Sequence, residues 1–180
     1  MDLGLSGKRA VVTGGSKGIG RRVVDLLVAE GCNVAFCARK DADVSDAVSV
    51  LSGGKAEVFG GVADVGDDAE FRAWMQEAIG QLGGLDFLIA NASSLVAGAN
   101  EEAWRKGMDI DILGTVRAFE EALPHLEASD CGSVTAISST AVRLFATGIW
   151  LHLTQARGPS TPRSVTVHSS EACQGRLRLS

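Results

Sequence analysis

Residues 9–21 read RAVVTGGSKGIGR, and this stretch determines most of what the sequence predicts about fold and function. An apolar run ends at Thr13, a glycine-rich turn follows, and residues 21–30 have the pattern of a helix. Glycines let the backbone turn tightly and approach a ligand closely, and the free N–H groups at a helix start attract negative charge. A strand, a glycine turn and a helix in this order predict a cradle for the pyrophosphate of a dinucleotide. A turn with a purely structural role is the alternative.

Apolar runs alternate with helical patterns through the first 148 residues. We expect strands at residues 10–13, 33–37, 56–60, 86–90 and 133–138, and helices near 18–30, 42–52, 67–82 and 101–128. Several of these strands are apolar throughout, which is typical of a sheet covered on both faces. The alternation predicts the α/β class: a three-layer Rossmann fold with a doubly wound parallel sheet of at least five strands, incomplete at its C-terminal end. A ligand is expected at the carboxyl ends of the strands, where the strand order reverses.

Composition and charge limit the possible partners. The 180 residues are 46% hydrophobic and 22% charged, which is typical of one globular domain. The net charge of −5, without a basic stripe, argues against nucleic acid. We expect neither a leader peptide nor a membrane span. The four cysteines, which have no metal-ligand spacing, favour reduced thiols in the cytoplasm over a disulfide and predict no metal site.

The spacing T-G-x-x-x-G-x-G at residues 13–20 resembles that of the short-chain dehydrogenase/reductase family. Three more segments resemble family motifs in the same order: Ala-Asp-Val at 63–65, Ala-Asn-Ala-Ser at 90–93, and Gly-Ser-Val-Thr-Ala-Ile-Ser-Ser at 132–139. Ser93 stands where the family usually has glycine. The resemblance covers residues 1–148 and implies strand order 3-2-1-4-5. It also implies hydride transfer between a nicotinamide cofactor and a small carbonyl or alcohol substrate.

The resemblance assigns cofactor contacts to the turn and to the ends of the following strands. In the family, the Asp-Val pair after the third strand holds the adenine ring. The cofactor-binding residues carried over in this way are Gly14, Ser16, Lys17, Gly18, Ile19, Gly20, Arg39, Asp64, Val65, Asn91 and Ala92.

The charges near the second strand favour NADP over NAD. NAD-specific sites usually carry an acidic residue at the end of this strand, which would repel a 2′-phosphate. Here Arg39 and Lys40 follow the strand, and Lys17 lies in the glycine turn. Arginine grips phosphate bidentately, and lysine adds a point charge. The chain thus resembles NADP-preferring members of the 3-oxoacyl-carrier-protein reductase type. The alternative is that Arg39 and Lys17 are two solvated surface cations. Asp41 is a nearby opposing charge.

The catalytic set implied by the family is incomplete in this sequence. Ser139 matches the serine that holds the substrate carbonyl, and Asp111 stands where an asparagine usually organises a water relay. A serine that caps a turn and an aspartate on a solvated helix face are the alternatives. The sequence has no tyrosine, and no lysine follows Lys106, so the family's proton donor and its lysine partner are absent. His152, thirteen residues after Ser139, is a weak substitute. We therefore expect impaired catalysis.

The composition changes near residue 149. Residues 149–180 contain four arginines, one glutamate and no lysine, and their Pro- and Ser-rich stretches show no sustained period. We expect a dinucleotide-binding domain at residues 1–148 and an atypical, poorly ordered tail at 149–180. Truncation or a changed reading frame is favoured over divergence.

Three functional interpretations follow from these observations. The first is an NADP-dependent carbonyl reductase or alcohol dehydrogenase, whose partners are NADP(H) and a small substrate. The second is a non-catalytic nucleotide-binding or interaction protein. The third is a defective fragment in which the fifth strand is an open hydrophobic edge. The resemblance also implies a homo-oligomer, which here would have to form without the family's C-terminal part.

Overall fold

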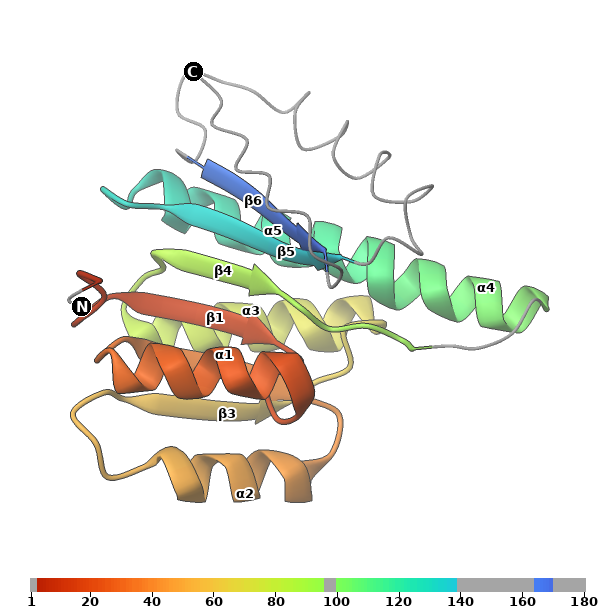
Figure 1. The fold of residues 1–180 in the computed structure, drawn as a ribbon. Helices are drawn as coiled ribbons and strands as arrows, with labels where there is room; N and C mark the ends of the chain where they lie inside the picture. The colour runs from red at the N-terminus through yellow and green to blue at the C-terminus, as the bar shows by residue number, and fades with distance from the viewer. Residues whose placement is uncertain (1–2, 96–99, 139–163, 170–180) are drawn as a thin grey trace.

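Six parallel strands form a single sheet in the order β3-β2-β1-β4-β5-β6 (Figure 1). The structure is a computed structural model that describes residues 3–95, 100–138 and, for the backbone, 164–169. The strands are β1 (Arg9–Thr13), β2 (Asn33–Ala38), β3 (Val58–Val62), β4 (Phe87–Ala90), β5 (Ser133–Ser138) and β6 (Ser164–Ser169). The predicted α/β class, the parallel sheet and the order of the first five strands are confirmed.

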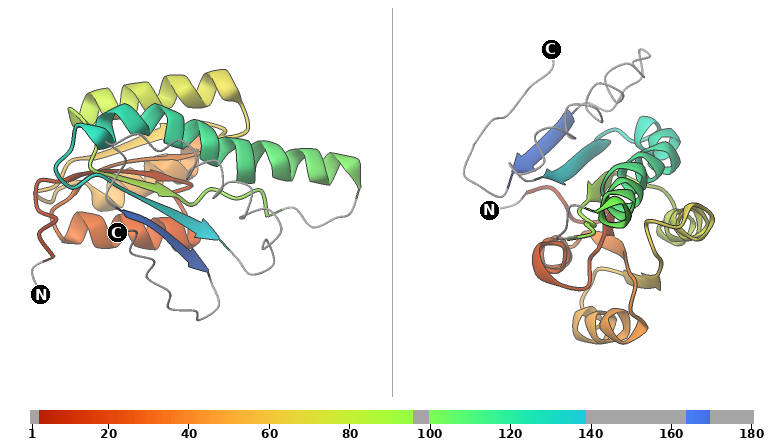
Figure 2. Two further views of the ribbon diagram at one scale, coloured as in Figure 1. Left: turned by 90° about the horizontal axis from the view of Figure 1, so that it is seen from above. Right: turned by 90° about the vertical axis from the view of Figure 1, so that its right-hand side faces the viewer.

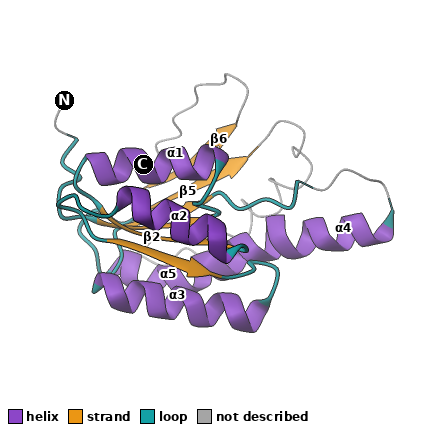
Figure 3. Cartoon of the chain, turned by 90° about the horizontal axis from the view of Figure 1, so that it is seen from below, coloured by secondary structure: helices purple, strands orange, loops and turns teal. Residues whose placement is uncertain are grey.

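Helices cover both faces of the sheet and make it the middle of three layers (Figures 2 and 3). They are α1 (Gly18–Ala29), α2 (Asp41–Leu51), α3 (Asp68–Leu82), α4 (Glu101–Gly107), the π-helical turn η1 (Met108–Leu113) and α5 (Gly114–Glu127). Side chains alternate across a strand. Ala10 and Val12 of β1 therefore pack in the core beneath α1 and α2, and Val11 packs in the core beneath α3 and α5.

Two glycines at the end of β3 bring helices close to both faces of the sheet. A Cβ on Gly60 would overlap Val44 and Val48 of α2, and one on Gly61 would overlap Trp74 of α3. The predicted strand at 56–60 is shifted two residues toward the N-terminus relative to β3, which runs from Val58 to Val62. Here the missing side chains let the strand continue to Val62 between two closely packed helices.

The edge of β5 is covered by a strand that the sequence pattern did not predict. The backbone of β6 pairs with β5 in parallel register from Ser133↔Ser164 to Ser138↔Ser169. Its three central residues, 165–167, read Val-Thr-Val and have high β propensity, but the Pro-rich composition around them indicated a loop. The open edge at β5, on which the third interpretation depended, is therefore absent from the described part of the structure. Residues 149–163 and 170–180 of the predicted tail lie outside the described residues.

A buried carboxylate joins the strands at their amino-terminal ends. Asp86, 4% exposed, accepts hydrogen bonds from the Arg9 backbone N (2.9 Å), from Arg9 Nε and Nη2 (3.0 Å each) and from Ser129 Oγ (2.6 Å). Burial alone would raise the pKa of this carboxyl group. The hydrogen bonds from Arg9 and Ser129 outweigh that effect and lower the pKa to about 2. Arg9 Nη1 also donates to the Gly83 carbonyl (2.7 Å), so the network connects β1 to the end of α3.

We expect the Asp86→Asn variant to lower the free energy of unfolding by about 2–4 kcal/mol at pH 7, because it removes the charge that Arg9 and Ser129 solvate. The folded-state pKa lies below the ordinary value of 3.8, so the stabilisation is complete above that value and is lost as the pH falls toward about 2. Urea unfolding between pH 7 and pH 2 measures both effects. Asp130→Asn, an exposed carboxylate in the adjoining loop, is the matched control. Equal losses in the two variants would contradict this account.

Candidate functional site

The glycine turn lies at the carboxyl end of the sheet, where the strand order reverses. β1 pairs with β2 on one side and with β4 on the other, and the turn after β1 leads directly into α1. The Gly15 amide donates to the Cys37 carbonyl (3.0 Å) and fixes the turn against the end of β2. Gly14 and Gly18 have φ values of 68° and 58°, a region that side chains disfavour.

The glycines of the turn have two different roles. A Cβ on Gly15 would overlap the Phe36 side chain, and one on Gly20 would overlap the Asn91 amide and the Gly14 carbonyl. Those two positions are therefore required for internal packing. A Cβ on Gly18 would have no heavy atom within 4 Å. The space in front of Gly18 is therefore open, and its positive φ of 58° accounts for the glycine.

The N-terminus of α1 differs from those of α3 and α4. Asp67 caps α3 by accepting from the Glu70 amide (3.0 Å), and Asn100 caps α4 by accepting from the Ala103 amide (2.9 Å). α1 has no side-chain cap at Lys17 and no acidic residue in its first turn. The first N–H groups of a helix lack intrahelical partners, so an uncapped, acid-free start is suited to an external anion. Ile19, in the first turn of α1, is 55% exposed beside this position.

Asn91 holds the turn in place from the end of β4. Its Nδ2 donates to the carbonyl oxygens of Thr13 (3.0 Å) and Gly14 (3.1 Å). Thr13 Oγ1 in turn accepts from the backbone N of Asn91 and of Ala92, both at 3.0 Å. The structure therefore brings Asn91, Ala92 and Gly14 together, and the Asn91 amide is engaged by the protein itself. Thr13, the first residue of the T-G-x-x-x-G-x-G motif, is the other half of this junction, a role that the sequence analysis did not assign to it.

Asp64 and Val65 lie after β3, two strands away from β1. Asp64 is half-buried, and its Oδ1 accepts from the Gly66 amide (2.9 Å). Val65 is 7% exposed, and its carbonyl accepts from Arg117 Nη1 (3.1 Å). Both residues are at the same edge of the sheet as the glycine turn, held there by the Ala63 amide, which donates to the Ala38 carbonyl (3.1 Å).

The charged groups near the end of β2 are arranged differently from the sequence expectation. Lys17 Nζ lies 2.9 Å from Asp43 Oδ2, in the first turn of α2. Arg39 is exposed and has no hydrogen bond or ion pair with another described residue. The sequence analysis considered Asp41 as the opposing charge and missed Asp43. The sequence does show that Asp43 is an acidic residue near a helix start. Such a residue is expected to interact with the helix dipole, so its position did not indicate an ion pair with Lys17 in the glycine turn.

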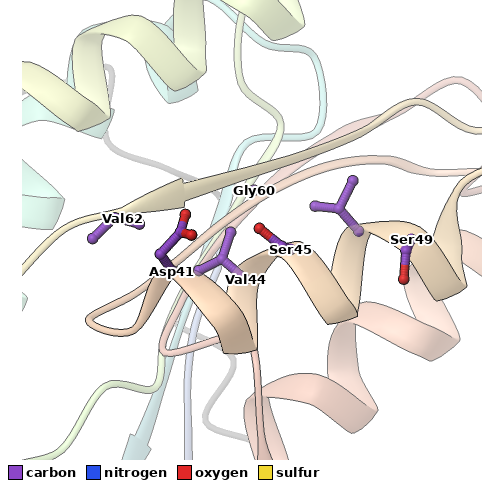
Figure 4. Close-up of a pocket in the computed structure, with 7 residues that line it drawn as sticks. Asp41, Val44, Ser45, Ser49, Gly60 and Val62 are labelled. Atoms are coloured by element: carbon purple, nitrogen blue, oxygen red, sulfur yellow. The ribbon is translucent and has the colours of Figure 1, made fainter.

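A crevice of about 460 Å³ lies beside this region, between α2 and β3 (Figure 4). It is lined by Asp41, Val44, Ser45, Val48, Ser49, Gly60 and Val62. No residue of the glycine turn contributes to it, and Ser49 Oγ donates to the backbone carbonyl of Asp46 (2.8 Å). The crevice lies where α2 packs on the edge strand and is separate from the turn.

Asp111 positions the segment that follows β4. It lies in η1, and its Oδ1 and Oδ2 accept from the Ser94 backbone N (2.8 Å) and Oγ (2.6 Å). Thr115 Oγ1 donates to the Asp111 carbonyl (3.0 Å). The predicted continuous helix at 101–128 is therefore interrupted by a π-helical turn, a feature frequent at functional sites. Ser94 was not predicted. Ser139, directly after β5, and His152 lie outside the described residues.

Among the described residues, no group of three His, Cys, Asp or Glu side chains could hold a metal ion. None of the described helices is both long and apolar enough to span a bilayer.

Comparisons with known proteins agree with this geometry. A 2,5-dichloro-2,5-cyclohexadiene-1,4-diol dehydrogenase of Sphingobium indicum is 37% identical over 143 residues, which are 76% of this chain and 56% of that protein. An isoepoxydon dehydrogenase of Penicillium expansum is 33% identical over 148 residues, 81% of this chain and 57% of that protein. The chain thus spans little more than half the length of these curated relatives.

Solved structures with the same fold include nucleotide complexes. A short-chain dehydrogenase of Burkholderia cenocepacia in complex with NADP matches with a TM-score of 0.74 and 25% identity, over 84% of this chain and 66% of that one. A blue fluorescent protein from a metagenomic library in complex with NADPH matches with a TM-score of 0.72 and 30% identity, over the same shares. The family model for the short chain dehydrogenases matches residues 8–148. The chain belongs to the short-chain dehydrogenase family.

Proposed function

We propose that this chain binds a nicotinamide dinucleotide with the pyrophosphate at the turn between β1 and α1. The observation that carries the proposal is the open space at Gly18, in front of a helix start that has neither a side-chain cap nor an acidic residue. The N–H groups of the turn and the α1 terminus would hold the phosphate oxygens, and Asp64 would lie toward the adenosine half. Asn91 would keep the turn in the binding conformation through its bonds to Thr13 and Gly14.

The proposed reaction is hydride transfer between the cofactor and a small carbonyl or alcohol. The names of the two curated relatives describe dehydrogenases, and both matches cover most of this chain. The bound dinucleotide supplies or accepts the hydride. Ser139, the residue that follows β5 in the sequence, is proposed to orient the substrate oxygen. Asp111 is proposed to act by holding the Ser94 segment beside it, because both of its carboxylate oxygens are already engaged.

We propose further that these 180 residues turn over slowly. The sequence contains no tyrosine and no lysine after Lys106, so the general acid expected from the family is absent. A serine hydroxyl is too weak an acid near neutral pH to replace it without an activating neighbour. This absence favours non-catalytic nucleotide binding as the second candidate function.

The preferred cofactor is proposed to be NADP(H). Arg39 is exposed at the end of β2 with its guanidinium unpaired among the described residues, and Lys17 extends from the turn. A guanidinium binds phosphate oxygens bidentately, and no acidic residue occupies the end of β2.

A reducing compartment such as the cytoplasm is proposed as the location. Cys32, Cys37 and Cys131 are free thiols, and Cys32 and Cys37 are buried. Burial raises the pKa of Cys32 and of Cys37 to about 12, so both remain protonated and unreactive near neutral pH. Cys173 lies outside the described residues.

The Gly18→Ala variant tests the proposed binding site. A Cβ there would occupy the open space before the α1 terminus, and we expect NADPH affinity to fall about tenfold or more, as for the loss of one charge-assisted hydrogen bond. Gly7→Ala is the matched control, since Gly7 also has a positive φ (73°) and open space around its Cβ position. Both variants should lose similar stability, about 1–2 kcal/mol. Fluorescence titration with NADPH measures the affinity of both variants. An unchanged affinity in Gly18→Ala would contradict the proposed binding site at this turn.

The Arg39→Gln variant tests cofactor choice. We expect wild type to bind NADPH more tightly than NADH, and the variant to lose about tenfold in NADPH affinity while NADH affinity stays constant. Lys40→Gln removes the same charge from the adjacent residue and should have a smaller effect. Tighter binding of NADH than of NADPH by wild type would overturn the preference.

Steady-state NADPH oxidation with simple ketones and aldehydes tests catalysis. We expect rates near background, because the loss of a positioned general acid alone costs about 10²–10⁴-fold. The Ser139→Ala variant should leave this background unchanged. Robust turnover that Ser139→Ala or His152→Ala abolishes would show that the chain contains a substitute proton donor.

A further inference from the structure

We propose that Asp43 is a specificity-determining residue of the cofactor site, which draws Lys17 away from a 2′-phosphate and so weakens the preference for NADP(H) over NAD(H). This inference rests on the proposed dinucleotide binding at the β1–α1 turn. It assigns to α2 the negative charge that opposes binding of the 2′-phosphate, whereas the glycine turn and the end of β2 supply positive charge.

The contact between Lys17 and Asp43 joins two elements that meet at the carboxyl end of β2. Lys17 Nζ extends from the turn, and Asp43 Oδ2 lies 2.9 Å from it on the first turn of α2. The turn is held against this strand end by the Gly15 amide, which donates to Cys37. Arg39, the other cation proposed to bind the 2′-phosphate, is in the connection between β2 and α2. The carboxylate therefore lies among the groups that would bind the phosphate.

The two partners differ in how firmly they are held. The Lys17 side chain is 70% exposed, whereas the Asp43 side chain is 22% exposed. The Asp43 amide donates to the Lys40 carbonyl (3.1 Å), and the neighbouring Val44 is buried in the core. The Asp43 backbone is thus fixed at the start of α2 and its carboxylate has a short reach, whereas the Lys17 ammonium ends a long, exposed side chain that can turn toward a ligand.

The charges decide the direction of the effect. An exposed ion pair is weak, so a phosphate, with about 1.5–2 negative charges at pH 7, can displace Asp43 as the partner of Lys17. Asp43 then loses its counter-ion and lies near a second anion, which costs binding energy. The 2′-hydroxyl of NAD(H) carries no charge and incurs neither cost. Arg39 and Lys17 therefore favour NADP(H), and Asp43 opposes them.

The Asp43→Asn variant tests whether Asp43 opposes binding of the 2′-phosphate. Adenosine 2′,5′-bisphosphate and AMP are suitable probes because they differ only in the 2′-phosphate and carry no nicotinamide. We expect the variant to bind the bisphosphate about two- to fivefold more tightly, the range of an exposed ion pair, with AMP affinity unchanged. The gain should shrink at high salt, because screening weakens exposed charges. Asp46→Asn, one turn further along α2 and exposed, removes the same charge and should give a smaller gain.

A double-mutant cycle with Lys17→Met tests whether Asp43 acts through Lys17. In the Lys17→Met background, Asp43→Asn relieves only the direct repulsion, so its gain should be smaller than in wild type. Asp43→Ser, which keeps a polar group at the start of α2, repeats the measurement if the asparagine variant does not fold.

The outcomes separate this inference from the function on which it rests. A selective gain for the bisphosphate that depends on Lys17 supports the role of Asp43. Equal changes for both probes, no change, or an equal gain from Asp46→Asn overturns it while leaving dinucleotide binding intact. Wild-type protein that binds neither NADPH nor NADH would refute the proposed function itself.

Discussion

The junction between Asn91 and the end of β1 is the constraint on which the site depends. One carboxamide donates to the carbonyl oxygens of Thr13 and Gly14, and the Thr13 hydroxyl accepts from the backbone amides of Asn91 and Ala92, which directly follow β4. These bonds lie where β1 and β4 separate to continue toward opposite faces of the sheet. Gly20 has no Cβ because one would overlap this amide. The turn is thus fixed by β4 on one side and by β2 on the other.

The two ends of the sheet use polar groups in opposite ways. At the amino-terminal ends, Asp86 is buried and fully engaged by Arg9 and Ser129, and its low pKa reflects that engagement. At the carboxyl ends, the α1 terminus is uncapped and Arg39 has no partner among the described residues. Satisfied groups stabilise the fold, whereas groups without an internal partner are available to a ligand. This contrast supports the proposed binding site at the carboxyl end independently of any relative.

The charges around the proposed 2′-phosphate position do not all favour one cofactor. Arg39 and Lys17 supply positive charge, but the Lys17 charge is shared with Asp43 of α2. On the proposed binding mode, cofactor choice depends on a balance between residues on three elements: the turn, the end of β2 and the start of α2. Asp111 is likewise engaged within the protein. Its two carboxylate oxygens accept hydrogen bonds from Ser94 and fix the segment after β4.

Hydrophobic patterns in the sequence by itself determined the α/β class and the parallel sheet, because such patterns are local properties. The order of five strands followed from the resemblance to the short-chain dehydrogenase/reductase family, and the spacing of Gly14, Gly18 and Gly20 predicted the phosphate cradle. The sequence pattern ended the third strand at Gly60 and did not show that β3 continues through Gly61, since the two helices that require glycines at positions 60 and 61 pack there only in the folded protein. It also missed β6, whose pairing with β5 joins distant segments. The contacts of Asn91 with Thr13, of Asp111 with Ser94 and of Lys17 with Asp43 were decided by tertiary structure alone. Each contact joins residues that are not separated by a regular helix or strand spacing. Only the packing of strands and helices brings them within hydrogen-bond distance.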